Sequence, residues 1–183
     1  VNILVLDTEG YSNTGGQTSK STPLGAVTKF SAGGKQSAKK NLADIAFSYG
    51  NVYVAQVAYG ARDMQTLKTF LEAESYPGTS LIIAYAPCIA HGVDLTDNHQ
   101  RQQLAVKSGH WTLFRYDPRR QRENKKPMQL DSKPPSLPYE DFLQGERRFS
   151  TLRHRDPEHA KQLAQMGQEE VTARYQHFAS LAE

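Results

Sequence analysis

The chain opens with VNILVL (residues 1–6), and this apolar run leads directly into DTEGYSNTGGQ (residues 7–17). The run has the length and the β-branched, apolar composition of a buried strand in a parallel sheet. Open α/β sheets bind their ligands in the crevice beyond the carboxyl ends of the strands. The polar groups and glycines after residue 6 therefore predict a ligand site. Because the chain opens directly on a core strand, we expect it to be a fragment of a longer protein.

The rest of the first two thirds alternates between strand and helix patterns. Three further strands are expected at residues 52–57, 80–85 and 110–116. Helical periodicity separates them at residues 38–48, 64–74 and 98–108. Ser37 would cap the first helix and Asp63 the second. This alternation predicts an α/β fold with an open, mostly parallel sheet, right-handed crossovers and flanking helices.

The apolar residues of two of these helices predict which faces are buried. On the first helix the buried face would hold Leu42, Ile45, Ala46 and Tyr49, and on the second Leu67, Phe70 and Leu71. After residue 117 the composition changes to a basic run and then to prolines at 127, 134, 135 and 138. We therefore divide the chain into an α/β part, residues 1–117, and a proline-rich connector with a helical tail, residues 118–183. The tail helix would begin at the Asp156–Pro157 cap and pack on a neighbouring element.

Composition limits the class of protein. With 183 residues, 38% hydrophobic and 22% charged, the chain fits one soluble α/β domain with a tail. It has no apolar run near the roughly 20 residues of a membrane span, no signal-peptide pattern, and a single cysteine, which excludes a disulfide framework. We therefore expect a cytoplasmic protein that does not bind membranes.

The net charge of +3 is too small to indicate nucleic-acid binding. Positive charge is concentrated in residues 115–126, a segment that contains six basic residues and two acidic ones. Clusters of this kind are more often solvated loops than recognition sites for an acidic partner.

The chemistry of the first loop is readable from its residues alone. Asp7, Thr8 and Glu9 offer the hard oxygen ligands that Mg²⁺ prefers, and Gly15 and Gly16 would let an anion approach the backbone. Lys20 could neutralise a phosphate. A divalent metal that bridges a diphosphate is the natural ligand, and an ordinary long turn is the alternative. Since connections after a strand usually have about 2 to 6 residues, the length of this loop favours a ligand.

Several motifs together carry a family resemblance. They are LDTEGYSNTGGQ (residues 6–17), SKSTPLGAV (19–27), GGK (33–35), APCIAHG (86–92) and QGERR (144–148). This series closely resembles the C-terminal part of the pyruvate:ferredoxin (flavodoxin) oxidoreductases and covers nearly the whole chain. The resemblance implies a thiamine-diphosphate-binding fold, of which residues 1–117 would be the C-terminal portion. It also implies that this part holds the diphosphate end of the cofactor.

The resemblance assigns roles to individual residues. Thr8 would bind Mg²⁺ through its hydroxyl and Gly10 through its backbone carbonyl, although family members commonly carry a larger residue in place of Gly10. Asn13 would be the catalytic residue, near the thiazolium ring and the bound pyruvate. Three further residues would line the cofactor, namely Thr14, Gly15 and Gly16.

Cys88 would be one of four ligands of a [4Fe-4S] cluster, a site that needs three more cysteines from elsewhere. By sequence alone, a single cysteine after a buried strand is more often an inert thiol.

The implied reaction is the oxidative decarboxylation of pyruvate to acetyl-CoA and CO₂. Coenzyme A would accept the acetyl group, ferredoxin or flavodoxin would accept the electrons, and the full-length enzyme would be a homodimer without nucleic acid. Because the fragment would hold only half of the thiamine site, we expect it to be inactive alone and to bind the cofactor weakly or not at all.

Three other functions stay open on the residues themselves. Gly15, Gly16 and Gln17 form the tripeptide that translation release factors use, which would indicate an RNA-associated module. Cys88 and His91 could form a hydrolase pair, although no orienting acid is evident. The chain could also be a structural or dimerisation domain without activity of its own, which would leave apolar surface exposed on an isolated fragment.

Overall fold

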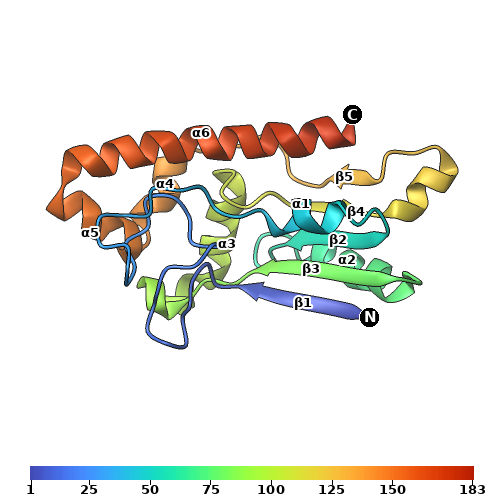
Figure 1. Ribbon diagram of the computed structural model, residues 1–183, viewed down its shortest axis with the longest axis horizontal. Coiled ribbons are helices and arrows are strands. Elements are labelled where there is room, and N and C mark those ends of the chain that lie inside the picture. Colours follow the sequence, from blue (N-terminus) through green and yellow to red (C-terminus); the bar gives the residue numbers. More distant parts are fainter.

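A five-stranded sheet organises the fold, and the computed structural model describes all 183 residues (Figure 1). The strands are β1 (Asn2–Asp7), β2 (Val52–Val57), β3 (Thr79–Tyr85), β4 (Phe114–Tyr116) and β5 (Met128–Leu130). Their order is β1-β3-β2-β4-β5, in which β1, β3 and β2 are parallel. This arrangement confirms the predicted α/β class with an open, mostly parallel sheet.

The fourth strand differs from its prediction. It covers only three residues rather than residues 110–116, and it runs antiparallel to β2. The backbone of the preceding residues bonds elsewhere, because Trp111 N donates to Ala105 O at 2.9 Å and Thr112 O accepts from the Gln56 side chain at 2.8 Å. β5 then adds a second antiparallel pair, from a region that we expected to be an extended connector.

The main helices are α1 (Leu42–Phe47), α2 (Asp63–Ser75), α3 (Asn98–Lys107), α4 (Tyr139–Gln144), α5 (Arg147–Arg155) and α6 (Pro157–Ala182). Short 3₁₀ turns occur at η1 (Ile89–His91), η2 (Leu95–Asp97) and η3 (Pro118–Glu123). The prediction of a Ser37 cap is wrong. α1 begins after Asn41, whose side chain accepts from Ala43 N at 3.1 Å, because the backbone before it pairs with the first loop through Lys40 N and Lys20 O. α4 and α5 were not predicted.

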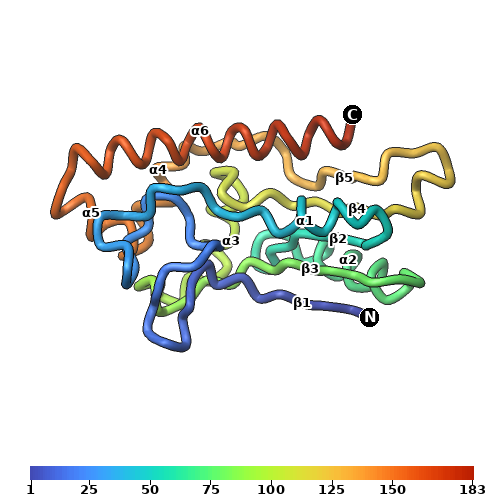
Figure 2. Tube along the Cα trace, in the orientation of Figure 1, coloured from blue at the N-terminus to red at the C-terminus, as the bar shows by residue number.

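The core lies on both faces of the sheet. On one face, Val54, Leu81 and Phe114 pack in the larger apolar cluster, to which α1 and α6 contribute. α6 runs along this side of the molecule, as Figures 1 and 2 show, and its Phe178 ring lies 4.5 Å from the Phe114 ring. The predicted tail helix therefore packs on its own chain. On the other face, residues of β2 and β3 pack with Ala73 of α2.

Apolar surface remains exposed on β1 and α2. The prediction that β1 is a buried core strand is wrong, because β1 lies at the edge of the sheet and its Leu6 is 64% exposed. The predicted burial of Leu67, Phe70 and Leu71 is wrong, since they are 43–59% exposed and α2 instead packs through Gln65, Thr69 and Ala73. The predicted face of the first helix is also wrong for its three large residues, Leu42, Ile45 and Tyr49, because α1 packs through Ala43 and Ala46.

Three of the six basic residues in the segment 115–126 form ion pairs within the chain, the third being Lys125 with Glu123. Arg115 pairs with Asp131 at 2.9 Å and with Glu72 at 2.6 Å, and Arg119 pairs with Asp117 at 2.7 Å. Arg120, Arg122 and Lys126 form no ion pair, so the excess positive charge of the segment is carried by these three residues. None of the helices has both the length and the apolar character that crossing a membrane requires.

Candidate functional site

Two loops leave the sheet side by side at the carboxyl ends of β1 and β3. Asp7 and Tyr85 are paired in the strand register, and Ala86 N extends the pairing to Asp7 O at 3.1 Å. Residues 8–17 follow β1, and residues 86–93 follow β3. Sequence motifs that lie about 80 residues apart therefore meet at one edge of the sheet.

Thr8 and Gly10 bring two oxygen atoms together in the first loop. The Thr8 hydroxyl lies 3.1 Å from the Gly10 carbonyl oxygen and 3.4 Å from the Ser12 hydroxyl. In this structure the Thr8 hydroxyl donates to the Gly10 carbonyl. The two atoms that the family resemblance assigns to Mg²⁺ are thus neighbours on one side of the loop. A larger residue at position 10 would be crowded here, because a Cβ would lie 3.2 Å from His91 Cε1.

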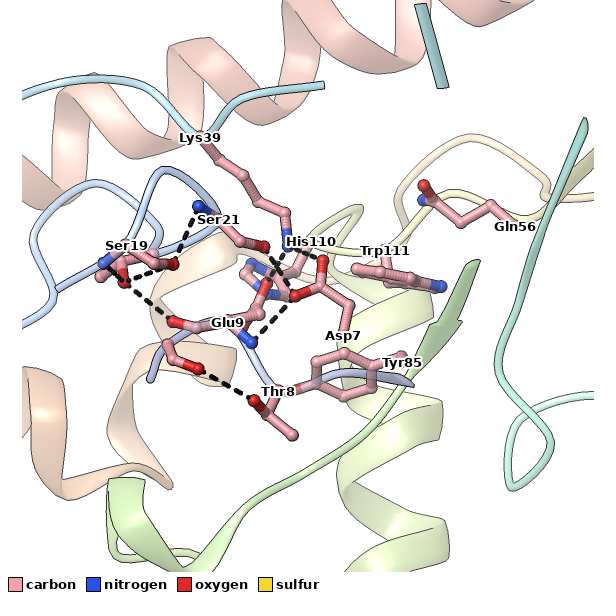
Figure 3. Close-up of polar contacts among 12 residues, drawn as sticks. Asp7, Thr8, Glu9, Ser19, Ser21, Lys39, Gln56, Tyr85, His110 and Trp111 are labelled. Atoms are coloured by element: carbon pink, nitrogen blue, oxygen red, sulfur yellow. Dashed lines mark hydrogen bonds and ion pairs between the residues drawn. The ribbon is translucent and has the colours of Figure 1, made fainter. Parts of the chain in front are cut away.

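Glu9 lies between them, with its side chain turned into the protein. Its backbone has a φ of 59°, in the left-handed region, and the residue is only 1% exposed. Its carboxylate accepts from Lys39 at 2.8 Å, Arg148 at 2.6 Å and His110 at 3.0 Å; Figure 3 shows the Lys39 and His110 side chains around it. Burial alone would raise the pKa of Glu9, but these donors outweigh it and hold the pKa well below its usual range.

The Glu9 contacts extend into a buried charge network. Arg148 also binds Glu146 at 2.5 Å, and Glu146 accepts from Arg101 at 2.8 Å. The pKa of Glu146 is lowered, since Arg148 and Arg101 offset the effect of burial. Burial lowers the pKa of His110, whose ring stacks 3.9 Å from the Phe142 ring. Sequence reasoning quoted Glu146 and Arg148 within a motif but did not assign them this role.

The carboxylate of Asp7, like that of Glu9, accepts hydrogen bonds from donors within the chain. Its carboxylate accepts from Lys39 Nζ at 2.7 Å, from Ser21 Oγ at 2.6 Å and from Glu9 N at 2.9 Å (Figure 3). Neither acid of this loop therefore presents a free carboxylate to a metal. No group of three or more His, Cys, Asp and Glu side chains in the chain has a metal-binding arrangement. The loop offers neutral oxygen atoms instead.

The turn at residues 11–17 has its own closed hydrogen-bond pattern. Gly16 N donates to Tyr11 O at 3.0 Å, and Gly15 N donates to Ser12 O at 3.3 Å. The φ angles of Gly15 and Gly16 are positive, 105° and 80°. The two glycines therefore supply the backbone conformation of the turn rather than free N–H donors. Asn13 lies exposed within this turn.

Gln17 is used to close the same turn. Its amide donates to Thr14 O at 2.6 Å and accepts from Thr14 Oγ1 at 2.5 Å. The functional glutamine of a release-factor tripeptide would have to be free to act on its substrate, so this geometry does not favour that reading.

A cavity of about 340 Å³ adjoins the loop of residues 8–17 that follows β1. Thr8, Glu9 and Gly10 form part of its wall, which also includes basic side chains. The basic residues that line it are Lys20, Lys39, Lys40 and Arg174. Lys39 is paired with Asp7 and Glu9, and Arg174 with Glu170, so Lys20 and Lys40 are the basic residues of the wall that form no ion pair.

Cys88 precedes the turn η1 in the second loop. Cys88 is half-buried, and its sulfur accepts a hydrogen bond from Ala90 N at 3.4 Å. His91 lies at the end of the same turn, but its Nε2 contacts Thr8 O at 2.6 Å. His91 is therefore engaged with a backbone carbonyl, which argues against a Cys88–His91 hydrolase pair.

Comparison with known proteins gives close matches over the whole chain. The chain is 57% identical to a pyruvate-flavodoxin oxidoreductase of Trichormus variabilis over 182 residues and 51% identical to the pyruvate:ferredoxin oxidoreductase of Moorella thermoacetica over 183 residues. A probable pyruvate-flavodoxin oxidoreductase of Escherichia coli is 52% identical over 182 residues. Each match covers 100% of this chain but only 15% or 16% of the relative.

No family model matches the chain. The matches to whole proteins nevertheless agree with the motifs quoted from the sequence. Over its whole length, the chain is therefore homologous to a segment of the pyruvate-flavodoxin and pyruvate:ferredoxin oxidoreductases.

Proposed function

We propose that this chain is the part of a pyruvate:ferredoxin or pyruvate:flavodoxin oxidoreductase that binds the metal and diphosphate of thiamine diphosphate. The full-length protein would convert pyruvate and coenzyme A to acetyl-CoA and CO₂, and pass two electrons to ferredoxin or flavodoxin. The names of relatives that are 51–57% identical support this reaction. We also propose that the full-length enzyme is a homodimer.

The pair of oxygen atoms at Thr8 and Gly10 is the observation that carries the proposal. Mg²⁺ binds oxygen in a near-ideal octahedron at about 2.0–2.1 Å, so adjacent ligands lie about 3 Å apart. The Thr8 hydroxyl and Gly10 carbonyl are 3.1 Å apart. One metal ion could therefore take both oxygen atoms as neighbouring ligands without a change in the loop, by replacing the hydrogen bond between them.

Thiamine diphosphate, when bound, supplies the electron sink for decarboxylation of the oxoacid. Thr8 and Gly10 would hold its Mg²⁺, and the exposed Asn13 would lie near the reacting substrate. Thr14, Gly15 and Gly16 would lie beside the cofactor, although none of them lines the 340 Å³ cavity. Because Asp7 and Glu9 are committed to internal ion pairs, an anionic metal ligand would have to come from elsewhere in the full-length protein.

Cys88 fits the role of a cluster ligand. Iron–sulfur clusters are bound by cysteine thiolates, and hydrogen bonds to the sulfurs tune their potentials. The bond from Ala90 N to Cys88 Sγ is of this kind. A [4Fe-4S] cluster held here would lie next to the metal loop and could accept the electrons of the reaction, with its other three cysteines supplied elsewhere.

Substitution of Thr8 in the full-length protein tests the metal site. Thr8→Val keeps the shape of the side chain and removes its hydroxyl, whereas Thr8→Ser keeps the hydroxyl. We expect Thr8→Val to raise the Mg²⁺ concentration for half-maximal thiamine diphosphate binding by about tenfold or more, and Thr8→Ser to stay within about threefold. Equal Mg²⁺ dependence of Thr8→Val and the wild type would refute the assignment.

Two further substitutions test the other assigned residues. Cys88→Ala should remove one [4Fe-4S] cluster, seen as lower iron content and loss of its paramagnetic signal in the anaerobically purified protein. Asn13→Ala should reduce pyruvate turnover without changing the fold. Wild-type iron content in the first variant, or wild-type turnover in the second, would exclude the residue from its proposed site.

A second candidate function is a structural or dimerisation segment without activity of its own. The exposed apolar residues on β1 and α2 favour a contact with other parts of the protein. The two candidates are compatible, and the Thr8 variants distinguish a purely structural segment from one that also binds the cofactor.

A further inference from the structure

His91 occupies an unusual place between the two loops of the site. It is 4% exposed and is the last residue of η1, the turn that begins after Cys88. Its backbone N–H donates to Cys88 O at 3.0 Å, which closes a single 3₁₀ turn. The histidine is therefore held at a fixed position relative to the cysteine.

The side chain of His91 reaches across to the first loop. Its Nε2 lies 2.6 Å from the carbonyl oxygen of Thr8, and this is the only side-chain hydrogen bond between residues 8–17 and residues 86–93. A carbonyl oxygen only accepts hydrogen bonds, so Nε2 carries the proton. Burial lowers the pKa of His91, which is consistent with a neutral ring in this tautomer.

This contact acts on the peptide group between Thr8 and Glu9. On one side the carbonyl oxygen accepts from His91, and on the other Glu9 N donates to Asp7 Oδ1 at 2.9 Å. A peptide plane that is bonded on both sides cannot rotate without losing both bonds. Rotation of this plane would change ψ of Thr8 and φ of Glu9, two of the backbone dihedrals that set the Thr8 hydroxyl and the Gly10 carbonyl relative to each other. His91 also packs against Gly10, where an added Cβ would lie 3.2 Å from its Cε1.

We propose that His91 is a positioning residue that fixes the Thr8–Glu9 peptide, so that the Thr8 hydroxyl and the Gly10 carbonyl stay arranged as a pair. The same hydrogen bond ties the cofactor loop to the segment that carries Cys88. The consequence for metal binding rests on the proposed function, whereas the consequence for loop order does not. His91 itself touches neither the metal nor the substrate in this proposal.

Variants of the full-length protein separate the hydrogen bond from the volume of the ring. His91→Phe keeps a ring and removes the donor, and His91→Gln keeps an N–H donor at nearly the same reach. His91→Asn is a second loss variant, in which the amide is too short to reach the carbonyl. His154→Phe is the matched control, since His154 also bonds a backbone carbonyl, Ser150 O at 2.7 Å, but on the exposed surface of α5.

The first measurement is hydrogen exchange of the amides of residues 8–12 without added cofactor. Loss of a bond to a buried carbonyl should speed exchange about tenfold in His91→Phe and in His91→Asn. His91→Gln and His154→Phe should stay within about threefold of the wild type. Wild-type exchange in the two loss variants, or exchange in His91→Gln as fast as in His91→Phe, would overturn the proposal.

The second measurement is the Mg²⁺ concentration for half-maximal thiamine diphosphate binding, with iron content recorded to verify cluster assembly. We expect an increase of about tenfold in His91→Phe and rescue in His91→Gln. If the Thr8→Val variant also leaves Mg²⁺ dependence unchanged, the metal assignment fails while the exchange data still decide the role of His91. If only Thr8→Val changes the Mg²⁺ dependence, His91 does not position the metal pair.

Discussion

Replacing Glu9 with glutamine should loosen the loop of residues 8–17, because Glu9 is the buried anion that anchors it. Glu9→Gln keeps the size of the side chain but removes the carboxylate shared by its three donors, Lys39, Arg148 and His110. Removing one partner of a buried ion pair costs about 3–5 kcal/mol. Lys39 keeps Asp7 and Arg148 keeps Glu146, so we expect a cost of about 3 kcal/mol, near the lower end of that range.

Hydrogen exchange in the full-length protein can measure this cost locally. A cost of about 3 kcal/mol corresponds to exchange that is about 100-fold faster. The effect should be seen both in residues 4–12 and in residues 144–150, because Arg148 joins these two segments. Glu123→Gln is the control, since Glu123 forms an exposed pair with Lys125 and its removal should have no measurable effect.

The outcome shows whether the ion pairs of Glu9 cause the conformation of the loop. If the ion pairs hold Glu9 in its left-handed backbone conformation, both segments will exchange faster together. Exchange within about threefold of the wild type in both segments would show that the ion pairs do not hold the loop. Faster exchange in residues 4–12 alone would show that Arg148 remains fixed by Glu146 without help from Glu9.

Two other predictions concern pH and packing. Burial lowers the pKa of His110 from its ordinary value of 6.5, so the unfolded state binds more protons and local stability should be complete above about pH 6.5 and fall below it. Exchange of residues 4–12, corrected for intrinsic rates, should thus depend less on pH in His110→Gln than in the wild type; an equal dependence would contradict this. Gly34→Ala should destabilise its loop more than Gly50→Ala. Both glycines have positive φ, but only the Cβ at Gly34 would collide with Leu163, at 2.9 Å, so equal exchange in the two variants would exclude a packing effect.

The strands were more predictable than the helix faces, and the reason is physical. Residues 52–57 form β2 as predicted, because a strand that is buried on both faces is typically a near-continuous apolar run, interrupted here only by Gln56. The periodicity of α2 indicated Leu67, Phe70 and Leu71 as a buried face, yet the helix packs through smaller residues. A periodic pattern shows that a face is apolar but not which element covers it. In a chain that spans 15% of its relatives, that element need not belong to the chain.

The position of the candidate site could be predicted from the sequence, but the buried ion pairs that hold its loop could not. The polar residues after β1 were expected to meet a ligand at the sheet edge, and the local sequence is enough for that inference. Glu9 and Arg148 are 139 residues apart, so no periodicity or spacing relates them. Charged residues are also solvated by default, which hides a buried pair from any reading based on composition. Only a fold that brings α5 against the end of β1 reveals the contact.

The ion pairs and hydrogen bonds that hold the loop would also affect the affinity of the loop for a ligand. A non-glycine residue in the left-handed region costs about 1–3 kcal/mol, and Glu9 has a φ of 59°. The ion pairs of its side chain and the bonds on both sides of the Thr8–Glu9 peptide offset that cost before any ligand arrives. Ordering a loop on binding would otherwise reduce the affinity. If Thr8 and Gly10 bind a metal as proposed, the buried network and His91 would contribute to that binding indirectly, because they order the two residues in advance.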